Sequence, residues 1–230
     1  MNFVKDLFDE IVEALQRNGG AIVEALGETG YMLGFSLLAA VLIGLPVGVT
    51  IFVTRPGGVR PMPWLFQLSN LYVTVVRSFP FLLFVVFLIP LTRAVYGTSF
   101  GTAAATFPMC FVAVALYARL AEQILLEIPQ GILQAARSMG ASTLQTVWMY
   151  LLVESRSGLV YALTSAAISL ISYSTVLGVV GGGGLGDFAM RYGYQEYDYV
   201  LMYTTVIIVV VLVQLMQVGG HRLSKALDRR

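Results

Sequence analysis

The segment Tyr31–Val53 has 23 consecutive residues without a charged side chain, and it is the strongest constraint on how this chain folds. A helix needs about 20 mostly apolar residues to cross the hydrocarbon core of a bilayer. Four further segments are also predominantly apolar. The composition agrees, because 57% of the 230 residues are hydrophobic and 12% are charged. We therefore predict an all-α membrane protein with five transmembrane helices. The predicted spans are 31–53, 65–91, 102–120, 157–180 and 199–218.

Prolines and paired glycines mark two of these spans. Pro46 lies inside the first span, where neighbouring helices or water can satisfy the freed carbonyl group. Pro80 lies inside the second span and is expected to kink it. The pairs Gly30/Gly34 and Gly44/Gly48 have GxxxG spacing, which predicts close packing of the first span against other helices.

The first 28 residues are acidic, with two basic residues against six acidic ones, which is the opposite of a secretory signal. Phe3, Leu7, Ile11 and Leu15 recur on one helical face. We predict a short amphipathic helix at the membrane interface, closed by Asn18-Gly19-Gly20. The predicted organisation is thus an N-terminal acidic amphipathic extension over residues 1–28 and a single transmembrane domain over residues 29–230.

The distribution of Lys and Arg predicts the orientation. Cytoplasmic segments of membrane proteins are enriched in these residues. With the N-terminus outside and the C-terminus inside, ten of the 14 basic residues fall on the inner side and four on the outer side. The four outer residues are Lys5, Arg17, Arg93 and Arg191.

The stretch Leu126–Glu154 is the longest polar interruption between the apolar segments. Pro129 suits the first turn of a helix, and Gly140 follows where a helix C-terminus belongs. Ser142 with Gln145 three residues later is a capping-box pattern that starts a second helix. From spacing alone, this helix–glycine–helix segment is either an amphipathic connector on the bilayer surface or a docking element for another protein.

The sequence shows no recognisable catalytic constellation. His221 is the one histidine and Cys110 the one cysteine, so neither a metal site nor a Ser-His pair is predicted. Gly181–Gly186 matches G-x-G-x-x-G formally, but it follows a membrane span and lacks the Gly-Lys-Ser/Thr ending of a P-loop. We predict that the chain is not an enzyme and holds no cofactor of its own. No basic run indicates nucleic acid as a partner.

The fourth span is the most polar of the five. Ser165, Ser169 and Ser172 are spaced to share a helix face, and Gly178/Gly182 repeat the GxxxG spacing. Small and hydroxyl residues on one face indicate either close helix packing or a lining for a polar solute. The candidate path and gate residues are Ser169, Ser172, Tyr173, Ser174, Thr175 and Val176.

Gln134-Ala135-Ala136, with Gly140 four residues on, resembles the EAA loop of ABC importer permeases. Gln134 stands where the family usually has Glu, so position 134 has no charge for an ion pair with the ATPase. Val153 stands where the family usually has Pro. In that family the loop forms the coupling helix that inserts into a cytoplasmic ATPase. The resemblance implies coupling to an ATPase by Gln134, Ala135, Ala136, Arg137, Met139, Gly140 and Ala141.

Further short segments of the sequence are similar to segments in the permease subunits of bacterial methionine ABC importers. They are Gly44–Val49, Val53–Gly57, Arg77–Phe81, Ile89–Arg93, Gly97–Ser99, Leu126–Pro129, Gly183–Gly186 and Arg191–Tyr194. The resemblance covers roughly residues 30–230. It implies the type I ABC importer permease fold and a multi-pass protein of the bacterial cytoplasmic membrane.

The same resemblance implies partners and a mechanism. The expected assembly is a homodimer on two cytoplasmic ATPase subunits, which bind ATP and Mg²⁺, with an extracytoplasmic substrate-binding lipoprotein delivering methionine. Transport is expected to proceed by alternating access. A permease for another polar amino acid and an ATP-independent carrier or channel remain the alternative functions.

Overall fold

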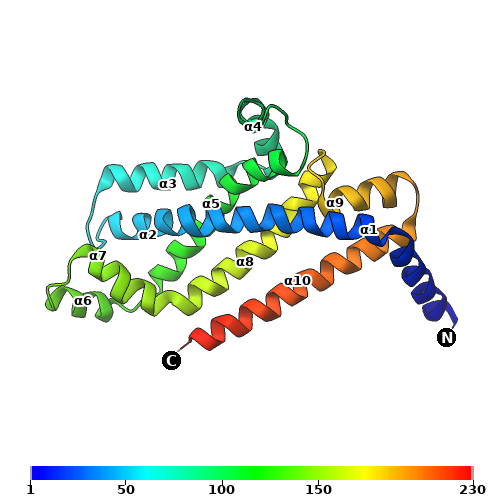
Figure 1. The fold of residues 1–230 in the computed structure, drawn as a ribbon. Helices are drawn as coiled ribbons and strands as arrows, with labels where there is room; N and C mark the ends of the chain where they lie inside the picture. Colours follow the sequence, from blue (N-terminus) through cyan, green and yellow to red (C-terminus); the bar gives the residue numbers. More distant parts are fainter. Residues whose placement is uncertain (1, 229–230) are drawn as a thin grey trace. The chain divides into compact units, whose positions relative to one another are not determined.

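The computed structural model describes the backbone of residues 2–228 and the side chains of residues 10, 11 and 13–228, and the regular secondary structure of this part of the chain is all helical (Figure 1). Three short segments with π-helical turns (η1 to η3) interrupt or extend the α-helices. The elements are α1 (Asn2–Ala39), η1 (Ala40–Gly44), α2 (Leu45–Thr54), α3 (Pro63–Ser78), α4 (Phe81–Tyr96), α5 (Thr102–Leu126), α6 (Gln130–Ser138), α7 (Thr143–Gln145), η2 (Thr146–Leu151), α8 (Leu152–Val179), α9 (Gly184–Phe188), η3 (Ala189–Gln195) and α10 (Tyr199–Leu227).

The apolar segments predicted as spans lie in helices. Four helical stretches in the described residues are long and apolar enough to cross a membrane, and the broken pair α3 and α4 makes a fifth if it counts as one span. The four are Glu13–Thr54, Thr102–Leu126, Thr143–Val179 and Tyr199–Leu227. The all-α membrane fold is therefore confirmed.

The predicted second span is broken rather than kinked. Helix α3 ends at Ser78, Phe79 is extended with φ −75° and ψ 134°, and α4 begins at Phe81. The residue before a proline disfavours the helical conformation, so Pro80 ends one helix and precedes the next. The expectation of a single kinked helix over residues 65–91 was wrong in this respect.

The N-terminal helix does not close at Asn18-Gly19-Gly20 as the sequence suggested. Helix α1 runs without interruption from Asn2 to Ala39 and carries the N-terminal extension directly into the first span. On the predicted apolar face, Phe3 and Leu7 lie outside the residues whose side chains are described, and Leu15 is exposed. Ala14 is buried instead. Tertiary packing evidently overrides the weak helix propensity of two glycines.

The first span accommodates Pro46 by a local change in helix geometry. The π-helical segment η1 directly precedes Leu45 and Pro46, which form the first turn of α2. A proline lacks the N–H that an interior helix position donates and its ring crowds the carbonyl group four residues back, and a π-helical turn relieves that conflict. The span therefore continues past its proline.

The two glycine pairs of the first span differ. A Cβ atom added at Gly44 would lie 2.8 Å from the carbonyl oxygen of Val114, and one at Gly48 would lie 2.5 Å from that of Ala118. These glycines let α2 approach α5 closely, as predicted. A Cβ atom added at Gly30 or Gly34 would have no atom of the described residues within 4 Å, apart from its own helix and chain neighbours. Packing at that pair is not found within the subunit.

The chain divides into two compact units. Unit 1 comprises Met1–Ser36, Phe81–Met109 and Ile168–Met216, and unit 2 comprises Leu37–Pro80, Cys110–Ala167 and Gln217–Arg230. Unit 1 has four basic and nine acidic residues, whereas unit 2 has ten basic and four acidic residues. Unit 1 therefore has a net charge of −5 and unit 2 a net charge of +6, although the whole chain is nearly neutral.

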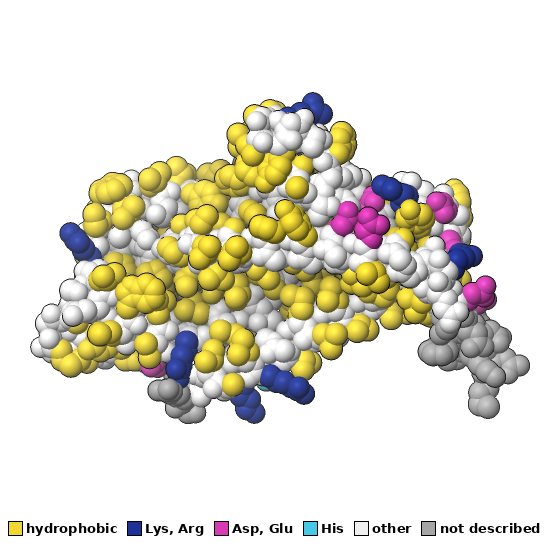
Figure 2. All heavy atoms as spheres, in the orientation of Figure 1, with side chains coloured by type: hydrophobic (Ala, Val, Ile, Leu, Met, Phe, Trp, Pro, Cys, Tyr) yellow, Lys and Arg dark blue, Asp and Glu magenta, His cyan; other side chains and the backbone are white. Residues whose placement is uncertain are grey.

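Each unit has its own apolar core. In unit 1, side chains of α1 pack with Leu185, Phe188 and Leu201. In unit 2, Phe52 and Val53 pack with Leu125, Ile128 and Leu151, which places the helix–glycine–helix segment against the end of the first span. Many large apolar side chains stay exposed, and Figure 2 shows a surface dominated by hydrophobic side chains with few charged ones. Such a surface suits lipid or protein neighbours.

Candidate functional site: the helix–glycine–helix segment

Helix α6 ends in the turn that the sequence predicted. Gly140 has φ +71°, a left-handed conformation that glycine adopts without a Cβ conflict. Its N–H donates to the carbonyl oxygen of Arg137 at 3.0 Å, and the N–H of Ala141 donates to that of Ala136 at 3.0 Å. These two bonds form a Schellman motif, which satisfies carbonyl groups left over at the helix end. At the other end, Pro129 is the N-cap and precedes the first turn, one residue earlier than expected.

The second helix starts with the predicted capping box. The side chain of Ser142 accepts the N–H of Gln145 at 3.3 Å, and the side-chain oxygen of Gln145 accepts the N–H of Ser142 at 2.8 Å. Each residue thus satisfies a backbone donor that the start of a helix leaves unpaired. The helix continues through η2 into α8, so this short helix and the fourth span form one continuous helical stretch.

One side of the segment is fixed to the body of unit 2. Ala136 is fully buried, and Ile132 and Leu133 pack against the core that contains Phe52 and Leu151. A guanidinium nitrogen of Arg137 donates to the carbonyl oxygen of Gly58 at 3.1 Å, which joins α6 to the loop between α2 and α3. The segment is therefore held by apolar packing and a long-range hydrogen bond.

The other side of the segment is exposed and apolar. Met139, Leu144, Trp148 and Met149 have exposed fractions of 64–68%. Large apolar side chains that cluster on one exposed surface indicate contact with lipid or protein. The segment thus combines a rigid base with a free apolar surface.

The predicted coupling residues are divided between these two sides. Gln134, Ala135, Met139 and Gly140 are exposed, Arg137 is exposed but holds Gly58, and Ala141 is half-buried. Ala136 faces the core and is inaccessible to a partner. A docking surface at this segment is therefore made by the exposed members and not by the full set.

The polar residues of α8 lie on different sides of that helix. Ser172 and Thr175 are exposed, whereas Ser174 is buried and donates its hydroxyl to the carbonyl oxygen of Ile171 at 2.7 Å. Thr175 also donates to Ile171, at 3.1 Å. Tyr173 stacks on Phe81 with ring centroids 4.5 Å apart. Ser169 and Val176 are half-buried. Hydroxyl groups bonded to their own helix need no other partner, so their presence does not by itself require a solute path.

The glycines at the end of α8 and in the segment after it allow neighbouring helices to pack closely. A Cβ atom at Gly178 would meet the backbone of Gly186 and Asp187, and one at Gly182 would lie 2.8 Å from the Cβ atom of Ala105. Gly178 and Gly182 thus allow other helices to pack closely against this segment, as their spacing suggested. The neighbour of Gly178 is α9, and that of Gly182 is α5. The segment is part of a turn into a helix, without the strand that a nucleotide-binding loop requires.

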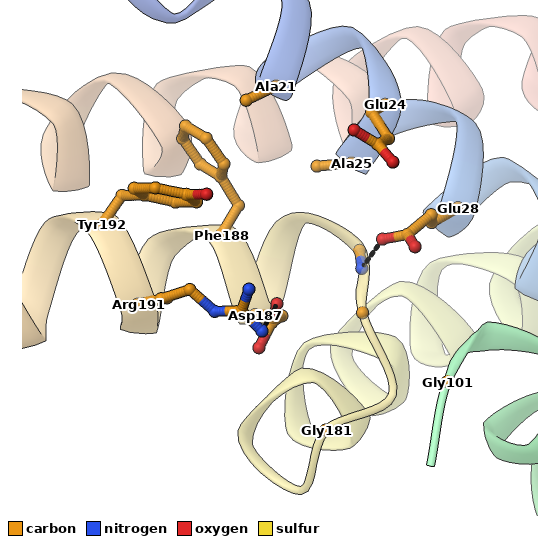
Figure 3. Close-up of a pocket in the computed structure, with 12 residues that line it drawn as sticks. Ala21, Glu24, Ala25, Glu28, Gly101, Gly181, Asp187, Phe188, Arg191 and Tyr192 are labelled. Atoms are coloured by element: carbon orange, nitrogen blue, oxygen red, sulfur yellow. Dashed lines mark hydrogen bonds and ion pairs between the residues drawn. The ribbon is translucent and has the colours of Figure 1, made fainter.

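Glu28 makes a long-range contact that the sequence did not reveal. Its carboxylate accepts the N–H of Gly184 at 2.6 Å (Figure 3). The same carboxylate accepts the hydroxyl of Thr102 at 2.9 Å, and the hydroxyl of Thr29 accepts the N–H of Leu185 at 2.9 Å. A carboxylate at a helix start stabilises its free N–H groups. These partners are separated by up to 156 residues, so no local pattern could have indicated them.

A cavity of about 260 Å³ adjoins Glu28 in unit 1. Glu24 and Glu28 of α1 line it together with Phe188 and Tyr192 of the following segment, and Figure 3 shows Glu28 pointing to the start of α9. Asp187 pairs with Arg191 at 3.0 Å. Among the residues whose placement is described, no group of three or more His, Cys, Asp or Glu side chains is arranged to hold a metal ion.

Comparison with known proteins places this architecture in a family. Residues 40–230 match the family model described as "Binding-protein-dependent transport system inner membrane component". The probable D-methionine transport system permease protein MetI of Vibrio cholerae is 38% identical over 223 residues, which cover 97% of this chain and 99% of that protein. The protein of the same name from Pasteurella multocida is 40% identical over 203 residues, covering 88% and 94% of the two chains.

A solved structure agrees with these relatives. An inward-facing conformation of the MetNI methionine ABC transporter aligns with a TM-score of 0.89 and 40% identity, covering 93% of this chain and 99% of that chain. The fold is thus that of an ABC importer permease, and the apolar helices make it a multi-pass protein of the bacterial inner membrane. The chain belongs to the family of binding-protein-dependent transport system inner membrane components.

Proposed function

We propose that this chain is the permease subunit of an ATP-driven importer for methionine. The observation that carries the proposal is the near full-length likeness to permeases named for methionine transport, in sequence and in fold. Methionine is favoured over another amino acid because those relatives share that name at about 40% identity. An ATP-independent carrier is disfavoured because the solved structure that this chain resembles at 40% identity is that of an ABC transporter.

The proposed assembly has two copies of this chain, two cytoplasmic ABC ATPase subunits and an extracytoplasmic substrate-binding lipoprotein. The ATPase subunits bind ATP and Mg²⁺ and catalyse hydrolysis, and this chain performs no catalysis. Binding of ATP favours one arrangement of the permease and hydrolysis restores the other, because the nucleotide has different affinities for the two states. The solute path then opens alternately to either side of the membrane.

The helix–glycine–helix segment is proposed to transmit this change. Its base is fixed by Ala136 and by the bond from Arg137 to Gly58, while Gln134, Ala135 and Met139 are free to contact an ATPase. A rigid lever with an exposed contact surface suits the transfer of a rigid-body movement. On α8, the exposed Ser172 and Thr175 are proposed to line the solute path, and Tyr173 to narrow it.

An outside N-terminus and an inside C-terminus are proposed for the chain. The predicted outer loops all fall in unit 1, and the predicted inner loops, including 126–154, all fall in unit 2. Ten of the 14 basic residues lie in unit 2, which supports a cytoplasmic location for the helix–glycine–helix segment.

The proposal is tested by substituting an exposed residue of this segment. Ala135→Trp places a large side chain on the exposed surface of α6 without entering the core. We expect loss of co-purification with the cognate ATPase subunit, and loss of ATP-dependent methionine uptake into vesicles. Ala103→Trp is the matched control, because Ala103 is exposed on α5 in unit 1. Full uptake by the Ala135 variant, or uptake by this chain without an ATPase, would contradict the proposal.

A further inference from the structure

A groove of about 390 Å³ opens in unit 2 beside the helix–glycine–helix segment. Its walls come from α2, the first turn of α3 and the stretch from α7 into α8. The lining is apolar almost throughout, with Leu45, Val49, Leu65, Val147 and Trp148 among its residues. A groove of this composition favours an apolar ligand over a polar solute.

Among the described residues that line the groove, Arg60 has the one charged side chain. The loop after α2 folds back on that helix, because the N–H of Arg60 donates to the carbonyl oxygen of Val53 at 3.1 Å and that of Met62 to Thr54 at 3.0 Å. The loop turns closely at Gly58, where an added Cβ atom would lie 2.6 Å from the Val53 carbonyl oxygen. Arg60 is thereby held at the mouth of the groove.

The guanidinium group of Arg60 is available to a ligand. The residue is exposed, and its side chain makes no hydrogen bond or ion pair with any side chain that the structure describes. By contrast, Arg137 nearby donates to the carbonyl oxygen of Gly58, and Thr54 at the groove donates its hydroxyl to Thr50 at 2.7 Å. The groove therefore has one unpaired cation at its mouth and satisfied polar groups inside.

Two observations locate the groove at the membrane–water boundary. The first apolar span ends at Thr54, on the wall of the groove. The chain's two tryptophans, Trp64 and Trp148, are 63% and 64% exposed beside it, and exposed tryptophans gather at this level of a bilayer. The surplus of basic residues in unit 2 adds an attraction for anionic lipid.

We propose that the groove binds an acyl chain of an anionic phospholipid whose phosphate contacts Arg60. The apolar lining matches the chain, and the free guanidinium group at the mouth matches the headgroup in charge and position. A lipid held there would contact α2, α3 and the helix–glycine–helix segment together. This lipid site does not involve the transported solute, so the lipid proposal is tested separately from the proposed import of methionine.

Fluorescence of Trp148 provides a direct test, because this side chain lines the groove. The Trp64→Phe variant of the full chain, in phosphatidylcholine vesicles, has Trp148 as its single tryptophan. Phosphatidylglycerol with brominated acyl chains is compared with brominated phosphatidylcholine as the quencher. We expect phosphatidylglycerol to reach half-maximal quenching at about a fivefold lower mole fraction, as one arginine–headgroup contact near the surface predicts.

Three controls identify the cause of such a preference. Arg60→Gln should abolish it while quenching by phosphatidylcholine persists. Arg222→Gln, which removes an exposed arginine near the end of α10, should leave it unchanged. The Trp148→Phe variant keeps Trp64, which is exposed but does not line the groove, and should show a weaker preference between the two lipids than the Trp64→Phe variant does.

Several results would overturn the proposal. Equal quenching by the two lipids, or a preference that survives Arg60→Gln, would exclude the headgroup contact. Loss of quenching when the ATPase subunit is bound would show that protein, and not lipid, covers the groove in the assembled transporter. Thermal unfolding of each variant establishes that it is folded before quenching is measured.

Discussion

Helices α7 and α9 each follow a glycine turn, and they are capped in opposite ways. The helix after Gly140 is capped by Ser142 and Gln145, which are part of the same short segment. Helix α9 follows Gly181–Gly183 and is capped by Glu28 and Thr29, which precede it by 156 residues. One cap is local in sequence, and the other exists only because α1 lies against α9.

The difference indicates how the two regions respond to movement. A local cap persists wherever its segment goes, so the helix–glycine–helix segment can remain a rigid lever while its surroundings shift. A long-range cap lasts only while α1 stays in place, because Glu28 also binds Thr102 of α5. The start of α9 therefore depends on the packing of three separate helices.

The largest expected effect follows from removing the long-range cap. Glu28→Ala deletes the acceptor for Gly184 and Thr102 and leaves a partly buried N–H group unpaired. We expect the free energy of unfolding to fall by about 2–3 kcal/mol, as for hydrogen bonds to a charged group. Thermal unfolding in detergent measures the change.

Glu24→Ala is the matched control for this substitution, because Glu24 is exposed on the same helix and lines the same cavity. Its unfolding temperature should match that of the unaltered chain. Glu28→Gln should recover part of the loss, since an amide oxygen still accepts the N–H of Gly184. Equal stability of the Glu28→Ala and Glu24→Ala variants would remove the basis for a long-range cap.

A smaller effect is expected at the glycines themselves, and it should differ between the two turns. Gly184 has φ +81°, and an added Cβ atom would lie 2.8 Å from the hydroxyl oxygen of Thr29. Gly140 has φ +71° with nothing within 4 Å of such an atom. Gly140→Ala should cost about 1 kcal/mol of backbone strain alone, and Gly184→Ala more than that. Equal losses of stability in the two variants would contradict this difference.

The smallest effect is expected at the local cap. Ser142→Ala removes the acceptor for the N–H of Gln145 and should lower stability by about 1 kcal/mol. Because this cap shares no partner with Glu28, the losses in a Ser142→Ala, Glu28→Ala double variant should add. Losses that combine to clearly more or less than their sum would show that the two regions are coupled energetically.

Much of the local structure could be predicted from sequence. The capping box, the turn at Gly140 and the close packing at Gly44 and Gly48 all follow from short patterns, and the structure has each of them. The same kind of pattern failed at Asn18-Gly19-Gly20, where α1 continues, and at Gly30/Gly34, where no atom of the described residues lies within 4 Å of an added Cβ atom. A spacing pattern specifies that a surface can pack, but a neighbour must be present for it to do so.

The candidate site divides in the same way. The QAA…G pattern located the segment, but burial of Ala136 and exposure of Ala135 depend on which face meets the core around Phe52. Likewise, Arg60 was counted only as a basic residue, and its place at an apolar groove depends on how the loop folds back on α2.

What the sequence by itself determined was the helical, membrane-spanning class and the local caps at Gly140 and Ser142, because these depend on hydrophobic length and on residues within one or two turns of each other. What only the tertiary structure decided was the cap of α9 by Glu28, the inward face of α6 and the apolar groove with its arginine. Those features bring together residues far apart in the chain, and their energies arise only when separate helices meet.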